Sequence, residues 1–379
     1  MRIEQYLWEK ESGWSPKNGI HPNENMQLVI LFGATDVLKE PGLFEDMKNR
    51  FPKAHTFGCS TAGEIHDTRV LDDSVVATCI EFERSRIVGS QIKLDSVAGS
   101  FSAGEKLADS LEKEGLRHVF VLSDGLNVNG SELVHGLMAN LPEDVTLTGG
   151  LAGNGERFAE TFVFWDDIPE KNTVAALGFY GNKLKIGYGS MGGWDPFGPE
   201  RIITKSQKNI LFELDGQSAL DIYKKYLGEH AKGLPATGLL FPLSIRTKTG
   251  EYGIVRTILS VSEENQSMTF AGDIPEGAYA RLMKANFERL IDGSQGAAKA
   301  SVEAMGPVPT ELAILVSCVG RKLVLKQRIE EEVEAVRDIL GKQAFLTGFY
   351  SYGEISPFAV GAKCALHNQT MTITTFSEI

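Results

Sequence analysis

The strongest constraint on the fold of this chain is a glycine motif that occurs three times along it. Each copy reads GxxxxGE, and the copies lie at residues 58–64, 150–156 and 348–354. Isoleucine follows the first and the third copy. Glycine is the residue that adopts positive φ angles without steric cost, so each copy is predicted to form a tight turn.

The sequence around each copy also repeats. An apolar run with strand character comes first, then a segment with helical spacing, then the motif, then another strand. The apolar runs lie at 27–32, 117–122 and 312–316, the helical segments at 41–50, 131–140 and 330–340, and the closing strands at 74–82, 175–180 and 370–376. Ser131 is the expected N-cap of the second helix. The pattern predicts duplicated strand–helix–strand–loop–strand units of about 60 residues.

The middle of the chain contains no clear copy of this unit. A helix is expected at 218–226 and another at 275–290, with alternating strands between 239 and 270. We expect an α/β fold with two related domains, mixed sheets and outer helices, for which an α–β–β–α sandwich is one arrangement. The predicted divisions are an N-terminal extension at 1–25, a first domain at 26–215 and a second domain at 216–379.

The glycine loops have two interpretations, which stay open at this point. They are turns and nothing more, or they converge on a pocket, because α/β folds bind ligands in loops at strand ends. Glutamate stands where a phosphate-binding loop needs lysine, so nucleoside triphosphates are disfavoured. The candidate ligand-binding residues are Gly58, Cys59, Ser60, Thr61, Gly63 and Glu64 of the first loop and Tyr350, Ser351, Tyr352, Gly353 and Glu354 of the third.

Cys59 supports a minor alternative, an enzyme that uses this thiol as its nucleophile. A lowered thiol pKa would be needed for that chemistry. The spacing around Ser60 is GxSxxG, whereas a nucleophile elbow requires GxSxG. The chain has four cysteines and no CxxC pair, so neither a disulfide framework nor a zinc ribbon is expected. We do not expect an enzyme.

Charge and hydropathy exclude several classes of partner. The formal net charge is −12, which disfavours binding to nucleic acids or anionic membranes. No apolar stretch approaches the ~20 residues of a membrane helix, and the acidic N-terminus does not resemble a signal peptide. We expect a cytoplasmic protein without membrane insertion, and a homodimer is one option for its oligomeric state.

Metal-binding patterns are weak in this sequence. The chain has seven histidines but no HxxxH or HExxH pair, which disfavours a zinc hydrolase. A single histidine is enough to ligate haem, and the candidates are His66, just after the first loop, and His367, before the last strand. Aromatic residues at 193–197 and 349–352 could wall a flat apolar ligand, or pack as a satellite core.

The segments 56–65, 346–355 and 366–374 together resemble the FIST proteins (F-box and intracellular signal transduction). The resemblance covers residues 25–375 and implies an N-terminal FIST domain followed by a C-terminal one. It implies a ligand-sensing module of bacterial signal transduction. Stand-alone proteins of this group include nitric-oxide-sensing haemoproteins. These act on a partner histidine kinase of a two-component system, and through it on cyclic-di-GMP and biofilm behaviour.

Three functional hypotheses follow from the residues and the resemblance. The first is a sensor that binds haem without covalent attachment, reads nitric oxide and regulates a histidine kinase. The second is a sensor of a small metabolite such as an amino acid, with Glu64 and Glu354 contacting an amine. The third is the Cys59 enzyme.

Overall fold

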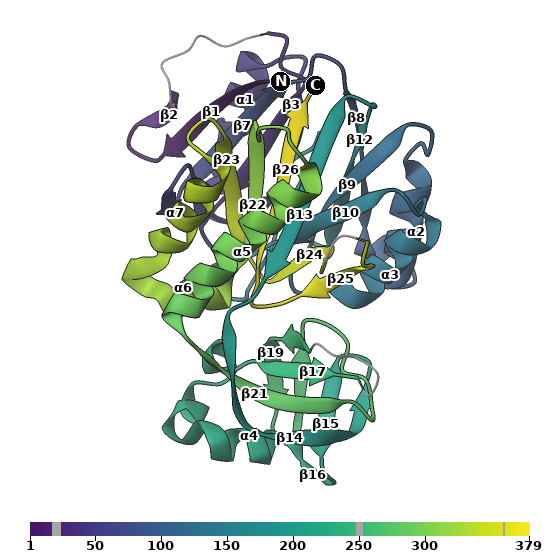
Figure 1. The fold of residues 1–379 in the computed structure, drawn as a ribbon, viewed down its shortest axis with the longest axis vertical. Helices are drawn as coiled ribbons and strands as arrows, with labels where there is room; N and C mark the ends of the chain where they lie inside the picture. The colour runs from purple at the N-terminus through teal and green to yellow at the C-terminus, as the bar shows by residue number, and fades with distance from the viewer. Residues whose placement is uncertain (17–23, 248–252, 359–360) are drawn as a thin grey trace.

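The chain folds into two bodies of unequal size, which two adjacent strands join (Figure 1). We describe a computed structural model, in which residues 1–16, 24–247, 253–358 and 361–379 are described. Residues 17–23 of the predicted N-terminal extension therefore lie outside the described residues. The mixed sheets and outer helices confirm the predicted α/β class.

The described residues of the larger body form three six-stranded sheets, which follow one plan. In each sheet, two parallel strands from one unit lie beside an antiparallel strand of the same unit. The first unit contributes β1 (Arg2–Glu9), β2 (Gly13–Pro16), β3 (Leu28–Gly33), β4 (His55–Ser60), β5 (Glu64–His66), β6 (Arg69–Leu71) and β7 (Val75–Glu81). The second contributes β8 (Arg86–Lys93), β9 (Leu116–Ser123), β10 (Thr146–Leu151), β11 (Val163–Trp165) and β12 (Thr173–Tyr180). The third contributes β13 (Leu184–Met191), β22 (Leu312–Cys318), β23 (Phe345–Ser351), β24 (Gly353–Pro357), β25 (Cys364–His367) and β26 (Met371–Glu378).

The three units exchange strands in a cycle. The strand that follows each glycine loop leaves its own sheet and pairs in the sheet of another unit. Thus β5 of the first unit pairs with β23, β11 of the second pairs with β4, and β24 of the third pairs with β10. The result is a pseudo-threefold body with three sheets around a shared core, instead of a two-sheet sandwich.

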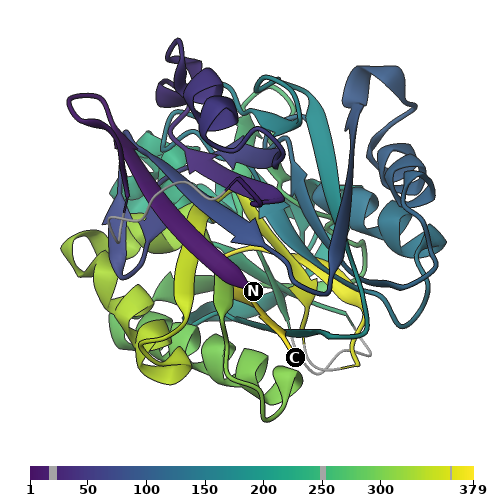
Figure 2. The ribbon, with the colours of Figure 1, turned by 90° about the horizontal axis from the view of Figure 1, so that it is seen from above.

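Helices cover three outer sides of this body (Figure 2). They are α1 (Leu43–Arg50), the pair α2 (Ser100–Ser110) and α3 (Gly130–Asn140), and the group α5 (Phe287–Met305), α6 (Val319–Leu325) and α7 (Ile329–Leu340). The central core combines aromatic side chains of all three sheets, including Phe32, Phe120 and Phe349. Asn129, not Ser131 as predicted, caps α3, because its side chain accepts hydrogen bonds from the N–H groups of Ser131 and Glu132.

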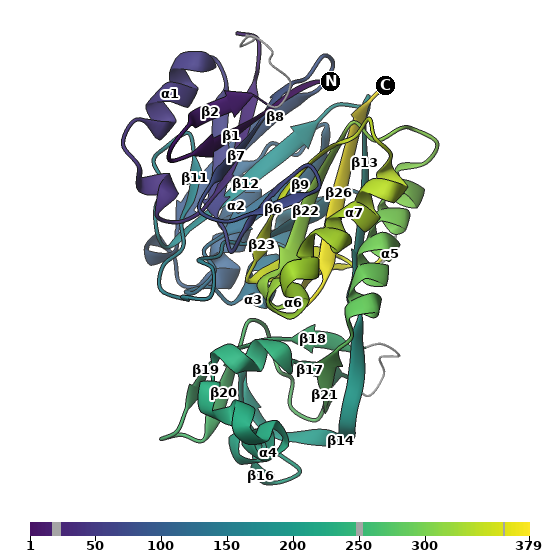
Figure 3. The same cartoon turned by 90° about the vertical axis from the view of Figure 1, so that its left-hand side faces the viewer.

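The smaller body is inserted between β13 and α5, so only the third unit carries it. Its described residues form an eight-stranded antiparallel sheet and an α-helix (Figure 3). Its strands are β14 (Trp194–Gln207), β15 (Ile210–Leu214), β16 (Gln217–Ser218), β17 (Leu243–Arg246), β18 (Ile254–Arg256), β19 (Ile258–Ser262), β20 (Ser267–Phe270) and β21 (Tyr279–Ala285), and its helix is α4 (Ala219–Leu227). Short 3-10 helices complete the chain at Val37–Lys39, Leu94–Ser96, Gly228–Gly233, Ala236–Leu240 and Lys326–Arg328.

Two predictions for the middle of the chain differ from this arrangement. Most of the helix predicted at 275–290 is wrong, because Tyr279–Ala285 form β21, which pairs with both β14 and β17, and α5 begins only at Phe287. Residue 216, where the sequence analysis divides the chain, lies inside the smaller body, between β15 and β16. Of the helices in the described ranges, none is long and apolar enough to cross a membrane.

Candidate functional site

The three glycine loops meet at the centre of the larger body. Backbone hydrogen bonds join the first loop to the third, from the Ala62 N–H to the Tyr350 carbonyl at 2.8 Å. Ser60 Oγ donates to the carbonyl of Gly153 in the second loop at 2.8 Å. The Tyr352 hydroxyl donates to the carbonyl of Gly155 at 3.0 Å, which joins the third loop to the second. The loops therefore converge, as one of the two interpretations requires.

The side chains of this convergence are packed against one another and buried. Hydrogen bonds within the protein occupy the polar ones. None of the following seven is more than 3% exposed: Ser60, Thr61, Glu64, Tyr350, Ser351, Tyr352 and Glu354. The sequence analysis nominated all seven as ligand contacts, and the structure places them in a packed interior.

Glu64 links the end of the first loop to the strand that follows. Its carboxylate accepts hydrogen bonds from Thr61 Oγ1, from Ser74 Oγ at 2.7 Å and from the Ser74 N–H at 3.3 Å. Ser74 directly precedes β7, so the carboxylate fixes the start of that strand. Burial raises the pKa of Glu64 from 4.5 to about 7, although these hydrogen bonds and the Lys322 ammonium oppose the rise.

Glu354 makes the same arrangement in the third loop. It accepts hydrogen bonds from Ser351 Oγ at 2.6 Å, from Thr370 Oγ1 at 3.0 Å and from the Thr370 N–H at 3.1 Å. Thr370 directly precedes β26. Burial raises the pKa of Glu354 from 4.5 to about 8. Both glutamates are therefore internal connectors, and neither presents a carboxylate to an amine ligand.

The second copy of the motif is shifted by one residue relative to the other two. Gly58 and Gly348 lie opposite Leu31 and Leu315 on their parallel neighbours, and a Cβ on either would come within 2.1 Å of the opposite carbonyl oxygen. In the second unit Gly149 takes this position, where a Cβ would lie 1.9 Å from the carbonyl oxygen of Val121.

This shift explains why the second unit lacks a buried glutamate. With Gly149 as the first glycine, the equivalent of Glu64 and Glu354 is Gly155, and Glu156 is exposed. Asp124 supplies part of the missing connection, since its carboxylate accepts a hydrogen bond from the N–H of Asn172, directly before β12, at 3.3 Å.

A buried ion pair behind the third loop escaped the sequence analysis. Arg321 Nη2 and Nε donate to Glu332 Oε2 at 2.7 and 2.9 Å, and both side chains are fully buried. The Tyr350 hydroxyl donates to Glu332 Oε1 at 2.7 Å. A charge run such as 328–337 is typical of a solvated helix face, but Glu332 within it is fully buried. The missed signal is that Glu332 stands four residues before Val336 and so lies on the buried face of α7.

Cys59 lies in the central apolar core and is fully buried. Burial raises the pKa of its thiol well above 9, so the thiolate is disfavoured. A nucleophilic cysteine needs the opposite shift. The environment of Cys59 therefore gives no support to the hypothesis of a Cys59 enzyme.

The two histidines nominated for haem lie in different sheets, on β5 and β25. His367 is buried, donates from Nε2 to the Ser356 carbonyl at 3.0 Å, and has its pKa lowered to about 4 by burial. Neither ring lines the cavities described below. With Nε2 bonded inside the protein, His367 as placed here does not fit an axial haem ligand. Within the described ranges, no group of three or more His, Cys, Asp or Glu side chains could hold a metal ion.

A cavity lies at the seam between the two bodies, and we call it the seam cavity. Its volume is about 290 Å³ and both bodies contribute to its wall. The larger body supplies residues of α3 and β25, and the smaller body supplies residues around β17, β18 and β20. The lining residues are Ser131, Val134, His135, Ile245, Thr247, Ile254, Arg256, Asp273, Pro275, Ala365 and Leu366. An apolar wall with few polar groups is typical of a small-molecule site.

Arg256 is the buried cation of this cavity, with 6% of its surface exposed. Nη1 donates to the Leu366 carbonyl at 2.9 Å, and Nε donates to the Asp273 carbonyl at 3.2 Å. Nη2 lies 3.5 Å from Ser131 Oγ, at the limit of a hydrogen bond. Burial lowers the pKa of Arg256 to about 10, and the charge of Asp273 opposes this.

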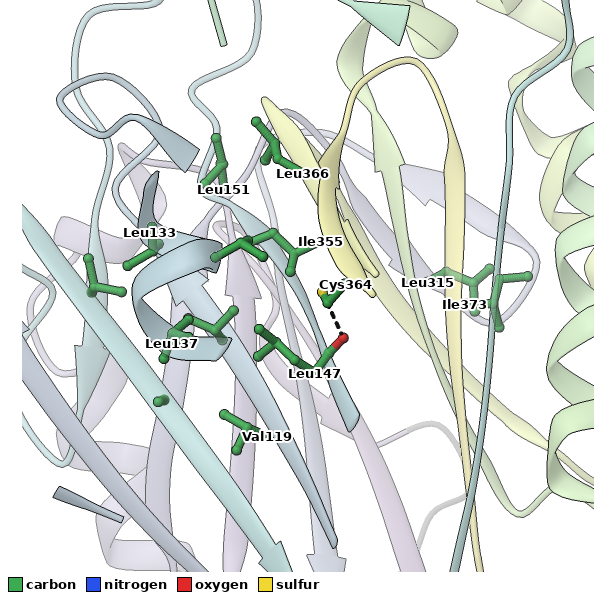
Figure 4. Close-up of a cluster of buried hydrophobic side chains, with 14 of the residues drawn as sticks. Val119, Leu133, Leu137, Leu147, Leu151, Leu315, Ile355, Cys364, Leu366 and Ile373 are labelled. Atoms are coloured by element: carbon green, nitrogen blue, oxygen red, sulfur yellow. Dashed lines mark hydrogen bonds between the residues drawn. The ribbon is translucent and has the colours of Figure 1, made fainter. Parts of the chain in front are cut away.

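Leu366, which lines the seam cavity, also belongs to the apolar core of the larger body (Figure 4). Leu366 and Cys364 of β25 extend into a cluster that includes Leu133 and Leu147. Cys364 Sγ donates to the Leu147 carbonyl at 3.3 Å. A second cavity of about 660 Å³ lies further along α3, and His135 lines both cavities.

The segment 366–370 connects the seam cavity with the third glycine loop. Its Leu366 carbonyl accepts the hydrogen bond from Arg256, and Asn368 Oδ1 accepts one from the Thr257 N–H at 3.3 Å. The last residue of the segment bonds to the glutamate of the third loop, as described above. Contacts at the cavity and at the loop centre therefore share one short piece of backbone.

Comparison with known proteins identifies the family. The family model described as FIST N domain matches residues 27–217, and the FIST C domain matches residues 219–357. Together they cover most of the chain, which belongs to the FIST family. FIST domains are associated with sensing in signal transduction. The resemblance inferred from the glycine motifs and the 366–374 segment is thereby confirmed.

Individual relatives add little beyond the family. An uncharacterised protein of Methanocaldococcus jannaschii is 26% identical over 387 residues, which cover 92% of this chain and 71% of that protein. Among solved structures, a cyanuric acid hydrolase from A. caulinodans is similar at 11% identity and a TM-score of 0.19, covering 78% of this chain and 99% of the hydrolase. A TM-score this low supports no conclusion about fold or activity.

Proposed function

We propose that this FIST protein is a sensor whose ligand, a small organic molecule, binds in the seam cavity. The observation that carries the proposal is the position of the cavity, because both bodies contribute to its wall. A ligand that contacts both bodies stabilises one relative placement of them by its differential affinity for that placement. Segment 366–370 then transmits the change to the central loops through the hydrogen bonds of its residues.

Neighbouring residues of β18 provide a matched test of this proposal. Ile254 lines the seam cavity. Val255 does not line it, because successive side chains of a strand point to opposite faces. Both side chains are partly exposed, so either position can accept a larger residue. We would screen small organic acids, amino acids and nucleobases by thermal shift against wild type, Ile254→Trp and Val255→Trp.

The proposal expects a ligand that raises the melting temperature of wild type and of Val255→Trp, since a ligand that binds only the folded state stabilises it. Ile254→Trp fills the cavity and should lose this response. An equal response in both variants would place the ligand elsewhere and contradict the proposal. Haemin belongs in the same screen. A Soret band that shifts with nitric oxide would favour the haem sensor over the metabolite sensor.

The receiver of the signal is a separate proposal. We infer from the family resemblance that a histidine kinase reads the protein, with a cytoplasmic location for both. Autophosphorylation of the candidate kinase, measured with ligand-loaded and ligand-free protein, tests this inference. No difference between the two would contradict it.

A further inference from the structure

The charge of Arg256 lacks a carboxylate among its described hydrogen-bond partners. Its partners in the described residues are two backbone carbonyls, of Leu366 and Asp273, and the Ser131 hydroxyl. All three are neutral acceptors. A buried charge without an opposite charge at hydrogen-bonding distance is costly, and an anionic partner relieves that cost.

Asp273 does not take that place as the structure has it. Its Oδ1 accepts a hydrogen bond from Asn129 Nδ2 at 2.9 Å, at the N-terminus of α3. Its backbone carbonyl, not its carboxylate, accepts from Arg256 Nε. The carboxylate of Asp273 is therefore bonded to Asn129 of the larger body. Arg256 keeps N–H groups for another partner, because a guanidinium carries five of them.

The guanidinium is held in place from several directions. Gly272 packs against it so closely that a Cβ at this position would lie 3.0 Å from Arg256 Cζ and 2.7 Å from Ser131 Oγ. Together with the two carbonyls, this contact fixes the planar group before any ligand arrives. Preorganisation of this kind reduces the cost of ordering a binding group. A planar guanidinium also matches the two oxygens of a carboxylate better than a point charge does.

The rest of the seam cavity fixes the other part of the ligand. Val134, Ile245, Ile254, Leu366 and Pro275 give it an apolar wall. We propose that the ligand is a small organic acid with an apolar body, whose carboxylate binds Arg256 while its body contacts this wall. The inference rests on the proposed function, since it names the class of ligand for the same cavity.

Pairs of acids and their primary amides test the inference on the full chain. We would measure binding of 4-methylpentanoate and 3-phenylpropanoate and of the two corresponding amides by NMR line broadening and calorimetry near pH 7. The amides keep the shape of the acids and lose the charge. A hydrogen-bonded charge of this kind is worth about a tenfold or larger change in Kd, so the amides should bind at least that much more weakly.

Variants supply the second arm of the experiment. Arg256→Met should weaken the acids to the level of the amides and leave the amides unchanged, while Arg256→Lys should recover part of the difference. The comparison of acid with amide in wild type decides the question even if Arg256→Met fails to fold.

The possible outcomes separate the two proposals. Acids that bind in the cavity at least tenfold more tightly than their amides support the carboxylate inference. Equal binding of acid and amide, abolished by Ile254→Trp, overturns the carboxylate inference and leaves the seam site standing. No saturable binding of any of the four compounds overturns the carboxylate inference, and the broader ligand screen then tests the seam site separately.

Discussion

The glycine loops and the seam cavity differ in how closely their side chains pack and in how visible they are in the sequence. The loops are conspicuous in the sequence, repeat three times, and are packed so closely that their polar side chains bond to one another. The seam cavity leaves almost no mark in the sequence, yet it holds a buried arginine beside an open volume of about 290 Å³. The most visible motif of the chain thus holds the fold together and leaves no room for a ligand.

The difference follows from symmetry. A strand exchange among three units requires three similar crossings, so the residues that make a crossing recur. The smaller body is inserted in one unit alone, between β13 and α5, and breaks that symmetry. The repeated residues therefore serve the fold, and we infer that the unrepeated insertion serves the ligand.

The largest expected effect comes from breaking the ion pair behind the third loop. Glu332→Ala leaves Arg321 buried without its partner and should lower the free energy of unfolding by about 3–5 kcal/mol. Its neighbour Glu331 pairs with Arg328 at the surface, so Glu331→Ala is a matched control that should cost about 1 kcal/mol or less. Urea denaturation at constant pH measures both. Equal stability of the two variants would show that the ion pair between Arg321 and Glu332 does not stabilise the fold behind the third loop.

A glycine substitution in a loop should have the next largest effect. In Gly348→Ala the new Cβ would lie 1.9 Å from the carbonyl oxygen of Leu315, which is backbone and cannot move aside. Overpacking of this kind costs about 1–3 kcal/mol and sometimes more. The midpoint of urea denaturation should fall accordingly. An unchanged midpoint would mean that the loop centre is looser than the structure has it.

The buried glutamates should give the protein a pH-dependent stability. Their pKa values in the folded state, about 7 for Glu64 and about 8 for Glu354, lie above the unfolded value of 4.5. Between these values the folded state holds protons that the unfolded state releases, so the free energy of unfolding falls as pH rises. Burial lowers the pKa of His118 to about 3 and that of His367 to about 4, so below about pH 7.5 the unfolded imidazoles still bind protons and oppose this fall. The glutamates are therefore tested between pH 7.5 and 8.5.

Glu354→Gln should make the slope in that window shallower, because the amide does not titrate. The four buried cysteines, whose pKa values burial raises, supply the slope that is left near pH 8.5. Glu156→Gln is the control, since Glu156 is exposed and should leave the slope as in wild type. Denaturant midpoints at several pH values measure the slopes. A wild-type stability that rises between pH 7.5 and 8.5 would contradict the burial of these carboxylates.

The smallest expected change in stability comes from the same type of substitution at the seam. In Gly272→Ala the Cβ meets side-chain atoms of Ser131, Leu366 and Arg256, which give way more easily than the backbone carbonyl that Gly348→Ala meets. The cost should stay within about 1 kcal/mol, while the displaced guanidinium binds acids more weakly. The contrast with Gly348→Ala is the point of the experiment. Strong destabilisation without loss of binding would reverse the roles of the two regions.

The sequence predicted the repeated units well because their signals are local. Apolar runs, helical spacing and glycine turns each lie within about ten residues, and β3, β9 and β22 fall close to the predicted strands. The register of the second loop was beyond reach, since Gly149 and Gly150 offer two alignments and only the parallel neighbour decides between them.

The candidate site was hidden for a different reason. Arg256 is a single arginine in a short apolar strand, and its partners come from residues 131, 273 and 366, far apart in the chain. No spacing rule links positions that meet only through the insertion of one body beside another. Burial, too, is invisible locally, which is why Glu64 and Glu354 resembled ligand contacts.

Photoaffinity labelling tests the central claim most directly, because it locates a ligand on the full chain. The probe is an aryl-alkanoic acid that carries a diazirine, with 3-phenylpropanoate as the unlabelled competitor. The account predicts competed labelling in peptides that contain residues 131–135, 254–256 or 365–366, and none in the loops at 58–64 and 348–354. Competed labelling at those loops, or labelling that the acid does not compete, would contradict it.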